Sequence, residues 1–199
     1  MSDLPGFFQG TEMPTTGWWS ALWPDPAAVL AAIGIVRGMD VIDLCCGDGW
    51  FTAPLAAIAR SLVAIDLDRN FLDAARTRVA ATGAMNCRFI AGNAYDVATL
   101  MSLRADYVLM ANAFHGVPDP ARLARAVIRV LTPGGRFGVV NWHKRPREET
   151  PLLGEPRGPR TELRLSPEET ASRVAPAGLK LVNLVELPPY HYGAIFAAG

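Results

Sequence analysis

The stretch VIDLCCGDGW, residues 41–50, decides the fold. Its first half is an apolar run typical of a buried strand, and Gly47 and Gly49 in its second half predict a tight loop. Both glycines permit positive φ and let a ligand approach the backbone closely. Ligands of open parallel sheets bind beyond the carboxyl ends of the strands. We therefore expect the first binding site to lie at this loop.

Strand-like and helix-like segments alternate from this stretch onward. Pro54 is tolerated only in a first helical turn, so the helix after the loop should begin near Thr52. The strand-like runs are 41–44, 62–65, 87–90, 107–110 and 137–140, and the helix-like segments between them are 53–60, 69–82 and 119–131. This alternation predicts a doubly wound α/β domain, in which helices cover both faces of a parallel sheet.

The carboxyl-terminal part departs from the alternation. Residues 143–166 are rich in proline and charge, which predicts a loop or lid. Residues 167–176 resemble a short helix. Residues 179–187 and 191–197 predict a hairpin at the sheet edge.

Length and composition restrict the class of protein. A chain of 199 residues suits one domain, so we predict an N-terminal cap or lid over residues 1–25 and a ligand-binding domain over 26–199. Nineteen basic and nineteen acidic residues leave no net field to attract nucleic acid or an anionic membrane. The longest apolar run, 27–36, is too short to span a bilayer, and the first residues lack a secretion signal.

Cysteine usage points to a reducing compartment. The chain has three cysteines, at 45, 46 and 87, which form neither a disulfide framework nor a zinc motif. We expect a soluble, cytoplasmic protein without a metal site. Its oligomeric state is not indicated by the sequence.

Asp66 stands at the end of the second strand, where a carboxylate accepts hydrogen bonds from the hydroxyls of a bound ribose. Such an acid occurs both in nicotinamide sites and in sites for S-adenosylmethionine (SAM). The dinucleotide fingerprint needs a third glycine where this chain has Thr52. The loop therefore favours a ligand with a single nucleoside over a dinucleotide.

Five motifs in order resemble those of class I SAM-dependent methyltransferases of the small-molecule kind, related to the quinone-methylating enzymes. They are VIDLCCGDG, VAIDLD, FIAGNAYD, ADYVLMANAFHGVPDP and LTPGGRFGVVNW, and the resemblance covers roughly residues 30–199. It implies a Rossmann-like seven-stranded sheet with an antiparallel last strand. It also implies SAM as the cofactor, S-adenosylhomocysteine (SAH) as its product, and transfer of a methyl group to a small-molecule acceptor.

The resemblance assigns cofactor-binding roles to residues of these motifs. The methionine part would lie against Asp43, Cys45, Gly47 and Gly49, the ribose on Asp66, the adenine at Leu67, Asn93 and Ala94, and the methyl channel at Asn112. Two positions depart from the family pattern. Cys45 replaces a glycine, and Asn93 replaces an aspartate and so loses charge assistance. We interpret Cys45 and Cys46 as packed thiols rather than reactants.

Histidines and aromatic residues at strand ends are the candidates for catalysis and acceptor binding. His115, after the fourth strand, and His143, after the fifth, are the candidate bases, although both are equally compatible with structural roles. Trp18, Trp19 and Tyr190 are the candidate substrate-binding residues, because aromatic faces stabilise a nearby cation. The alternative is that these rings pack on the sheet edge.

Two questions stay open at this stage. The segment 144–164 has six basic residues against four glutamates, which is typical of a solvated surface but also suits an anionic group on the acceptor. A non-catalytic SAM-binding protein and a nicotinamide-dependent reductase remain the alternative functions. The sequence does not indicate the acceptor atom.

Overall fold

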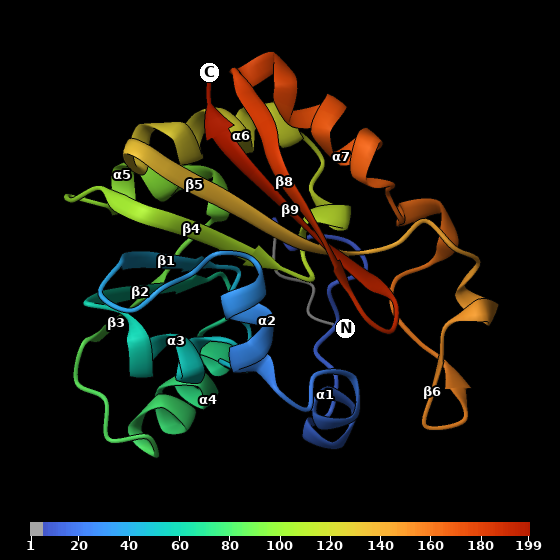
Figure 1. Ribbon diagram of the computed structural model, residues 1–199. Helices are drawn as coiled ribbons and strands as arrows, with labels where there is room; N and C mark the ends of the chain where they lie inside the picture. Colours follow the sequence, from blue (N-terminus) through green and yellow to red (C-terminus); the bar gives the residue numbers. More distant parts are fainter. Residues whose placement is uncertain (1–5) are drawn as a thin grey trace.

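The computed structural model describes residues 6–199, so the first five residues of the predicted cap lie outside the described part. A seven-stranded sheet with the order β3-β2-β1-β4-β5-β9-β8 forms its centre (Figure 1). The first five strands in sequence pair in parallel, and β9 runs antiparallel to both neighbours. The strands are β1 Asp40–Leu44, β2 Ser61–Asp66, β3 Cys87–Ala91, β4 Ala105–Ala111, β5 Leu131–Trp142, β8 Leu179–Leu187 and β9 His191–Ala198. The predicted sheet and its antiparallel last strand are confirmed.

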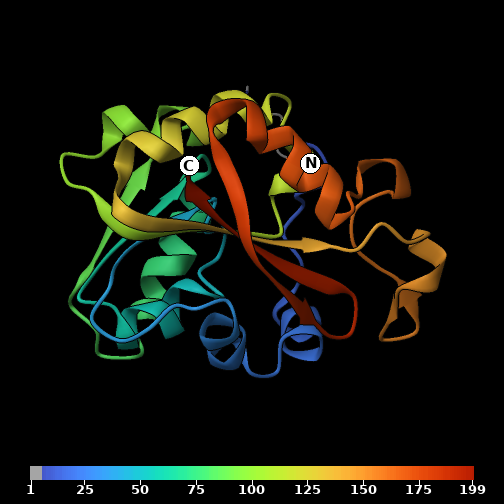
Figure 2. The same ribbon diagram turned by 45° about the horizontal axis from the view of Figure 1, so that its top comes forward.

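Helices cover both faces of this sheet. In Figures 1 and 2, α2, α3 and α4 lie on one face and α5, α6 and α7 on the other. The helices are α1 Thr16–Leu22, α2 Pro26–Ala32, α3 Thr52–Ile58, α4 Arg69–Ala80, α5 Val97–Leu100, α6 Pro120–Val130 and α7 Pro167–Val174. Helices α1, α2 and α5 lie outside the predicted helices, because α1 and α2 precede the alternation of strands and helices and α5 has only four residues.

Local sequence explains where the principal helices start. Helix α3 begins at Thr52, which places Pro54 in its first turn as predicted. Helix α6 is capped by Asp119, whose side chain accepts a hydrogen bond from the Arg122 backbone at 2.9 Å. Helix α7 begins with a capping box between Ser166 and Glu169.

Strand β5 is longer than the predicted run and contains the Pro-Gly-Gly turn at its start. Leu131 pairs with Ala105, and the next pair joins Arg136 to Tyr107, so residues 132–135 bulge from the sheet. The predicted proline-rich loop, residues 143–166, contains a small hairpin of β6 Pro151–Leu152 and β7 Glu155–Pro156.

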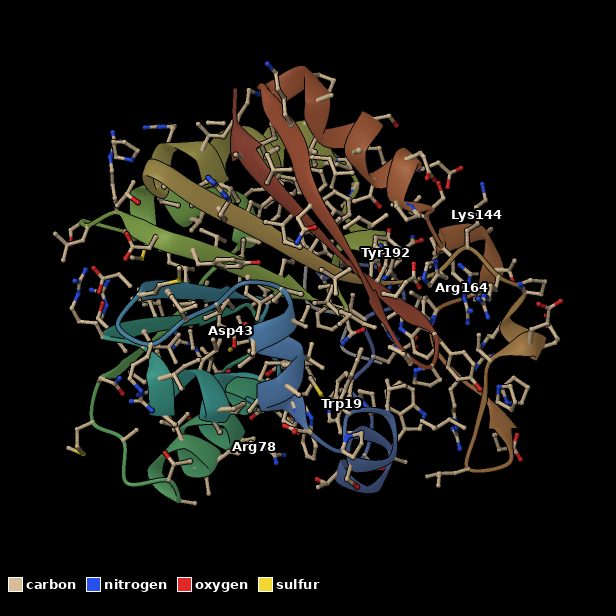
Figure 3. All side chains as sticks on the ribbon, viewed as in Figure 1. Trp19, Asp43, Arg78, Lys144, Arg164 and Tyr192 are labelled. Carbon is tan, nitrogen blue, oxygen red and sulfur yellow. The ribbon has the colours of Figure 1, made fainter. Side chains whose placement is uncertain are left out.

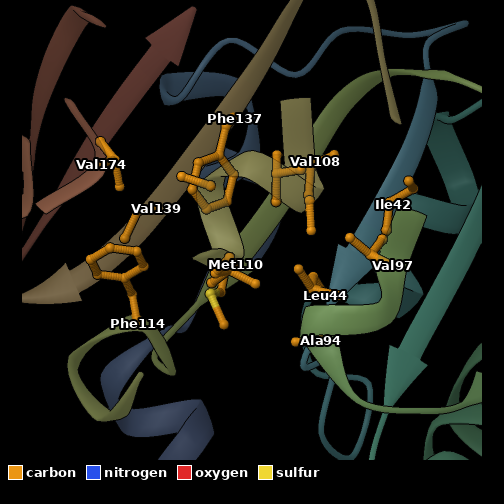
Figure 4. Close-up of a cluster of buried hydrophobic side chains, with 14 of the residues drawn as sticks. Ile42, Leu44, Ala94, Val97, Val108, Met110, Phe114, Phe137, Val139 and Val174 are labelled. Atoms are coloured by element: carbon orange, nitrogen blue, oxygen red, sulfur yellow. The ribbon is translucent and has the colours of Figure 1, made fainter. Parts of the chain in front are cut away.

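Apolar clusters on the two faces hold the strands in place. In Figure 4, strands β1, β4 and β5 point Ile42, Val108 and Phe137 into one cluster, and all three side chains are fully buried. Burying a side chain of this size contributes about 1.5–3 kcal/mol. The rigid sheet therefore fixes the carboxyl ends of β1, β2 and β4 relative to one another.

Candidate active site

A cavity of about 450 Å³ opens at the carboxyl ends of the strands. Three parts of the chain build its wall: the N-terminal segment, residues 6–15, with the start of α1; the carboxyl ends of β1 to β5 with the loops that follow β1 to β4; and the proline-rich loop after β5. Because β2 lies on one side of β1 and β4 on the other, the cavity sits where the strand order reverses. This is the position that the sequence predicts.

The two glycines of the loop after β1 have different structural roles. Gly47 lines the cavity with φ of 55°, and a Cβ built on it would lie 2.2 Å from Met13 Cε of the N-terminal segment. Gly49 faces away from the cavity, because a Cβ there would lie 2.8 Å from Cα of Ala75 in α4. Gly49 was predicted to contact the cofactor, but the geometry gives it a packing role instead.

Cys45 adopts φ of 61°, in the left-handed region that favours glycine. This explains why the family pattern has a glycine here. Burial raises the pKa values of the Cys45 and Cys46 thiols well above their ordinary range, so both stay protonated near neutral pH. This agrees with packed, unreactive thiols.

Asp43 and Asp66 place two buried carboxyl groups on the cavity wall (Figure 3 labels Asp43). Asp43 Oδ2 accepts a hydrogen bond from the Thr52 hydroxyl at 2.6 Å, and burial raises its pKa to about 7. Asp66 accepts from the backbone N–H groups of Gly47 at 2.8 Å and Asp68 at 3.0 Å. Burial also raises the pKa of Asp66. Asp66 therefore shapes the glycine loop and keeps lone pairs for a ligand.

The predicted adenine-binding residues gather at the same end of the cavity. Leu67, Asn93 and Ala94 all line it. Asn93 Oδ1 already accepts a hydrogen bond from the Tyr95 backbone at 3.0 Å, and so caps the turn of residues 94–96. A carbonyl oxygen has two lone pairs, which leaves one for a ligand.

Asn112 lies at the end of β4 with φ of 57°. Its backbone N–H donates to the Val140 carbonyl at 2.8 Å, but its side-chain Oδ1 and Nδ2 are buried and have no hydrogen-bond partner among the described residues. Asn112 also lines the cavity. A strained backbone and an unsatisfied buried amide at one residue are typical of a ligand-binding position.

His115 is buried on the cavity wall, and both of its ring nitrogens are engaged. Nδ1 lies 3.2 Å from Asn141 Oδ1, and Nε2 lies 2.9 Å from the carbonyl oxygen of Gly10. Because a carbonyl oxygen only accepts, Nε2 carries a proton in this state. Burial lowers the pKa of His115, which favours the neutral ring. In this state Nε2 has no lone pair to accept a proton and Nδ1 faces Asn141, so His115 holds the N-terminal segment through Gly10.

The N-terminal segment lies directly over the turn that carries His115. A Cβ on Gly116 would lie 2.1 Å from the carbonyl oxygen of Gln9. The family pattern has a second histidine at this position, and the structure shows why this chain has a glycine. The sequence predicts a cap over residues 1–25, but it does not indicate these contacts, because the segment has no periodicity to show where it packs.

The remaining predicted residues divide into two groups. Trp18 and Trp19 line the cavity and pack edge to face, with ring centroids 5.1 Å apart. Tyr190 and His143 are not among the cavity residues. The Tyr190 hydroxyl donates to the Pro151 carbonyl at 2.7 Å, and His143 Nε2 lies 2.9 Å from Glu186 Oε2. Neither side chain is positioned for contact with a ligand in this cavity.

About half of the chain is similar in sequence to known methyltransferases. Residues 41–135 match a family model described as a methyltransferase domain. The demethylmenaquinone methyltransferase of Shouchella clausii (strain KSM-K16) is 33% identical over 110 residues, which make up 52% of this chain and 45% of that protein. The chain spans less than half of the length of this relative and of the demethylmenaquinone methyltransferase of Lactococcus lactis subsp. lactis (strain IL1403).

Solved structures share the whole fold. The crystal structure of a SAM-dependent methyltransferase from Aquifex aeolicus aligns with a TM-score of 0.76 at 23% identity, covering 92% of this chain and 93% of that one. The DhpI-SAH complex aligns with a TM-score of 0.68 at 22% identity, covering 93% of this chain and 88% of that one. At 23% and 22% identity, these two structures establish a shared fold.

Residues 41–135 are thus similar to a methyltransferase domain, and the fold is the one seen in solved SAM-dependent methyltransferases. In sequence, the chain is similar over about half of its length to demethylmenaquinone methyltransferases such as that of Shouchella clausii. No helix among residues 6–199 is long and apolar enough to cross a membrane. In the same described range, no group of three or more His, Cys, Asp or Glu side chains is arranged to hold a metal ion.

Proposed function

We propose that this protein transfers a methyl group from SAM to a small-molecule acceptor bound in the same cavity. The observation that carries the proposal is one cavity of about 450 Å³ that contains the carboxyl groups of Asp43 and Asp66 and the unpartnered amide of Asn112. Ligand sites commonly have volumes of roughly 300–1,000 Å³, so the cavity is large enough for a nucleoside with its amino-acid tail. The residues present therefore fit the cofactor.

The chain's own residues would bind and orient the two reactants. Asp43 and the Gly47 loop would hold the amino-acid part, Asp66 the ribose hydroxyls, and Leu67 with Asn93 the adenine. When bound, SAM supplies a methyl group on a sulfonium sulfur. The N-terminal segment excludes water from above, and much of the rate of such a displacement comes from alignment in a water-poor site. His115 would hold the N-terminal segment over the reactants through its bond to Gly10.

Zero net charge and three free cysteines support a small-molecule acceptor, rather than nucleic acid, and a cytoplasmic location. Isothermal titration calorimetry with SAH and with NAD tests the cofactor. We expect SAH to bind with micromolar affinity and NAD to give no heat. Absence of SAH binding would overturn the proposal, and binding of NAD alone would favour a reductase.

The variant Asp66→Ala tests the ribose contact. We expect its affinity for SAH to fall by at least about tenfold, because a charge-assisted hydrogen bond contributes roughly 1.5–3 kcal/mol. Asp73→Ala is the matched control, since Asp73 is an exposed acid on α4 outside the cavity. Thermal unfolding of both variants checks that the fold is intact. Equal SAH affinity in Asp66→Ala and the control contradicts the assignment.

A further inference from the structure

The cavity has opposite charges on its two sides. Asp43 and Asp66 lie on the side of β1 and β2, whereas Arg147 and Arg157 of the proline-rich loop line the other side. Glu12, on the N-terminal segment, is a further acid on the wall and forms no ion pair with either arginine. The proposed cofactor would bind on the acidic side, so the arginine side has no ligand assigned to it.

Neither arginine forms an ion pair within the described residues 6–199. Among residues 6–199, no carboxylate oxygen lies within 4.0 Å of a nitrogen of Arg147 or Arg157. Their Nε atoms bond to main-chain carbonyls, Arg147 to Gly158 at 3.1 Å and Arg157 to Leu152 at 3.5 Å. These bonds fix each side chain at its Nε and leave the terminal Nη atoms for another partner.

A third arginine strengthens the positive charge behind this wall. Arg164, near the end of the proline-rich loop (labelled in Figure 3), is 1% exposed and has no carboxylate partner in the described part of the chain. Its Nη2 donates to the Arg157 carbonyl at 2.8 Å, and its Nη1 is buried without a partner. Burial and the charge of Arg147 lower its pKa to about 10, so it stays cationic at neutral pH. The carbonyl oxygens of Pro159 and Arg157 and the Thr150 hydroxyl accept hydrogen bonds from Arg164, so neutral groups hold this cation in place and its charge adds positive potential behind the wall.

Apolar side chains complete this end of the cavity. Trp18 and Trp142 are almost fully buried and line it, and the Arg164 guanidinium lies 5.0 Å from the centre of a Trp142 ring. An acceptor that fits here has a planar apolar body for the tryptophans and a negative group for the arginines. The planar fork of arginine matches the two oxygens of a carboxylate, phosphate or phosphonate.

We propose that the methyl acceptor is an anionic small molecule with a planar apolar body, whose negative group binds Arg147 and Arg157. This inference rests on the proposed function, because it assigns the acceptor side of the same cavity. It narrows the substrate class that the sequence leaves open.

Three small probes test the proposal: phenylphosphonate, benzoate and the neutral benzamide. Each is titrated to tens of millimolar at constant ionic strength, and tryptophan fluorescence reports binding at Trp18 and Trp142. We expect both anions to bind at least about tenfold more tightly than benzamide. In the double variant with Arg147→Gln and Arg157→Gln, this preference should disappear.

Arg160→Gln is the matched control. Arg160 belongs to the same loop, lies 3.2 Å from Glu162 and does not line the cavity. This variant should keep the full preference for the anions. The proposal is overturned if benzamide binds as tightly as benzoate, or if Arg160→Gln loses as much affinity as the double variant.

Titrations with and without saturating SAH separate the two proposals. Anion preference without SAH binding supports the arginine site and contradicts the cofactor assignment. SAH binding without a preference for the anions would support the methyltransferase proposal and contradict the proposal of an anionic acceptor.

Discussion

Asn112 combines two unfavourable features, a left-handed backbone and a buried amide without a partner. We predict that Asn112→Gly raises the free energy of unfolding by about 1 kcal/mol, because glycine accepts this φ without strain and leaves no amide unsatisfied. The same change should weaken SAH binding about tenfold. Chemical denaturation and calorimetry measure the two effects. Asn112→Ala keeps the backbone strain and loses the amide, so it should weaken SAH binding without the full gain in stability. If Asn112→Gly is less stable than the wild type, this interpretation is wrong.

Asp43 is the residue whose ionisation couples the site to pH. Its pKa is about 7 in the folded protein against an ordinary value of 3.8, so the folded state binds the proton more tightly than the unfolded chain. The free energy of unfolding should therefore decrease as pH rises from about 4 to about 7. We predict that Asp43→Asn removes this dependence and is more stable than the wild type at pH 8 by on the order of 2 kcal/mol.

The ligand should show the opposite preference. An ionised Asp43 attracts the ammonium group of SAH, so wild-type affinity should increase as pH rises through about 7. In Asp43→Asn, SAH affinity should be lower and almost independent of pH between 6 and 8. Urea titrations and calorimetry at pH 5, 6, 7 and 8 measure both quantities. Equal pH slopes in the two proteins show that Asp43 stays ionised throughout.

At the scale of elements, the N-terminal segment is the part that encloses the cavity. It touches the glycine loop through Met13 and the turn after β4 through Gly10 and Gln9. We predict that Gly116→Ala loosens it, because the new methyl group collides with the Gln9 carbonyl. Hydrogen exchange of residues 6–15 should become faster, while exchange in the sheet stays unchanged.

Gly17→Ala provides the matched control for that experiment. Gly17 lies in α1, and a Cβ there meets nothing within 4 Å. Alanine is the better helix former, so this variant should be stabilised by roughly 0.5–1 kcal/mol without faster exchange in the segment. If Gly116→Ala behaves like this control, the segment is not held by its contact with Gly116.

For the whole molecule, ligand binding should appear as added stability. The cavity lies between the sheet and two covering segments, the N-terminal segment and the proline-rich loop. We predict that SAH at one hundred times its Kd stabilises the folded protein by about 2.7 kcal/mol and raises Tm by roughly 5–10 °C. Differential scanning fluorimetry measures this shift. An unchanged Tm, with SAH binding absent in calorimetry, argues against a cofactor site.

The sequence alone determined the sheet, the principal helices and the positions of Asp43, Asp66 and Asn112 on the cavity wall. Strand alternation, the glycine loop and Asp66 are local in sequence, and each acts within one strand and the loop that follows it. Parallel strands then bring their carboxyl ends to one edge, so local motifs are enough to place Asp43, Asp66 and Asn112 together.

Only the tertiary structure decided which residues close the cavity and what charge its acceptor side carries. The contacts of Gly10 with His115, and of Gly49 with Ala75, join parts of the chain that no local pattern relates. Arginines in a polar loop look solvated in sequence, and only packing shows that Arg147 and Arg157 face a cavity without carboxylate partners. Periodicity reports the burial of regular elements, whereas irregular segments take their positions from long-range contacts.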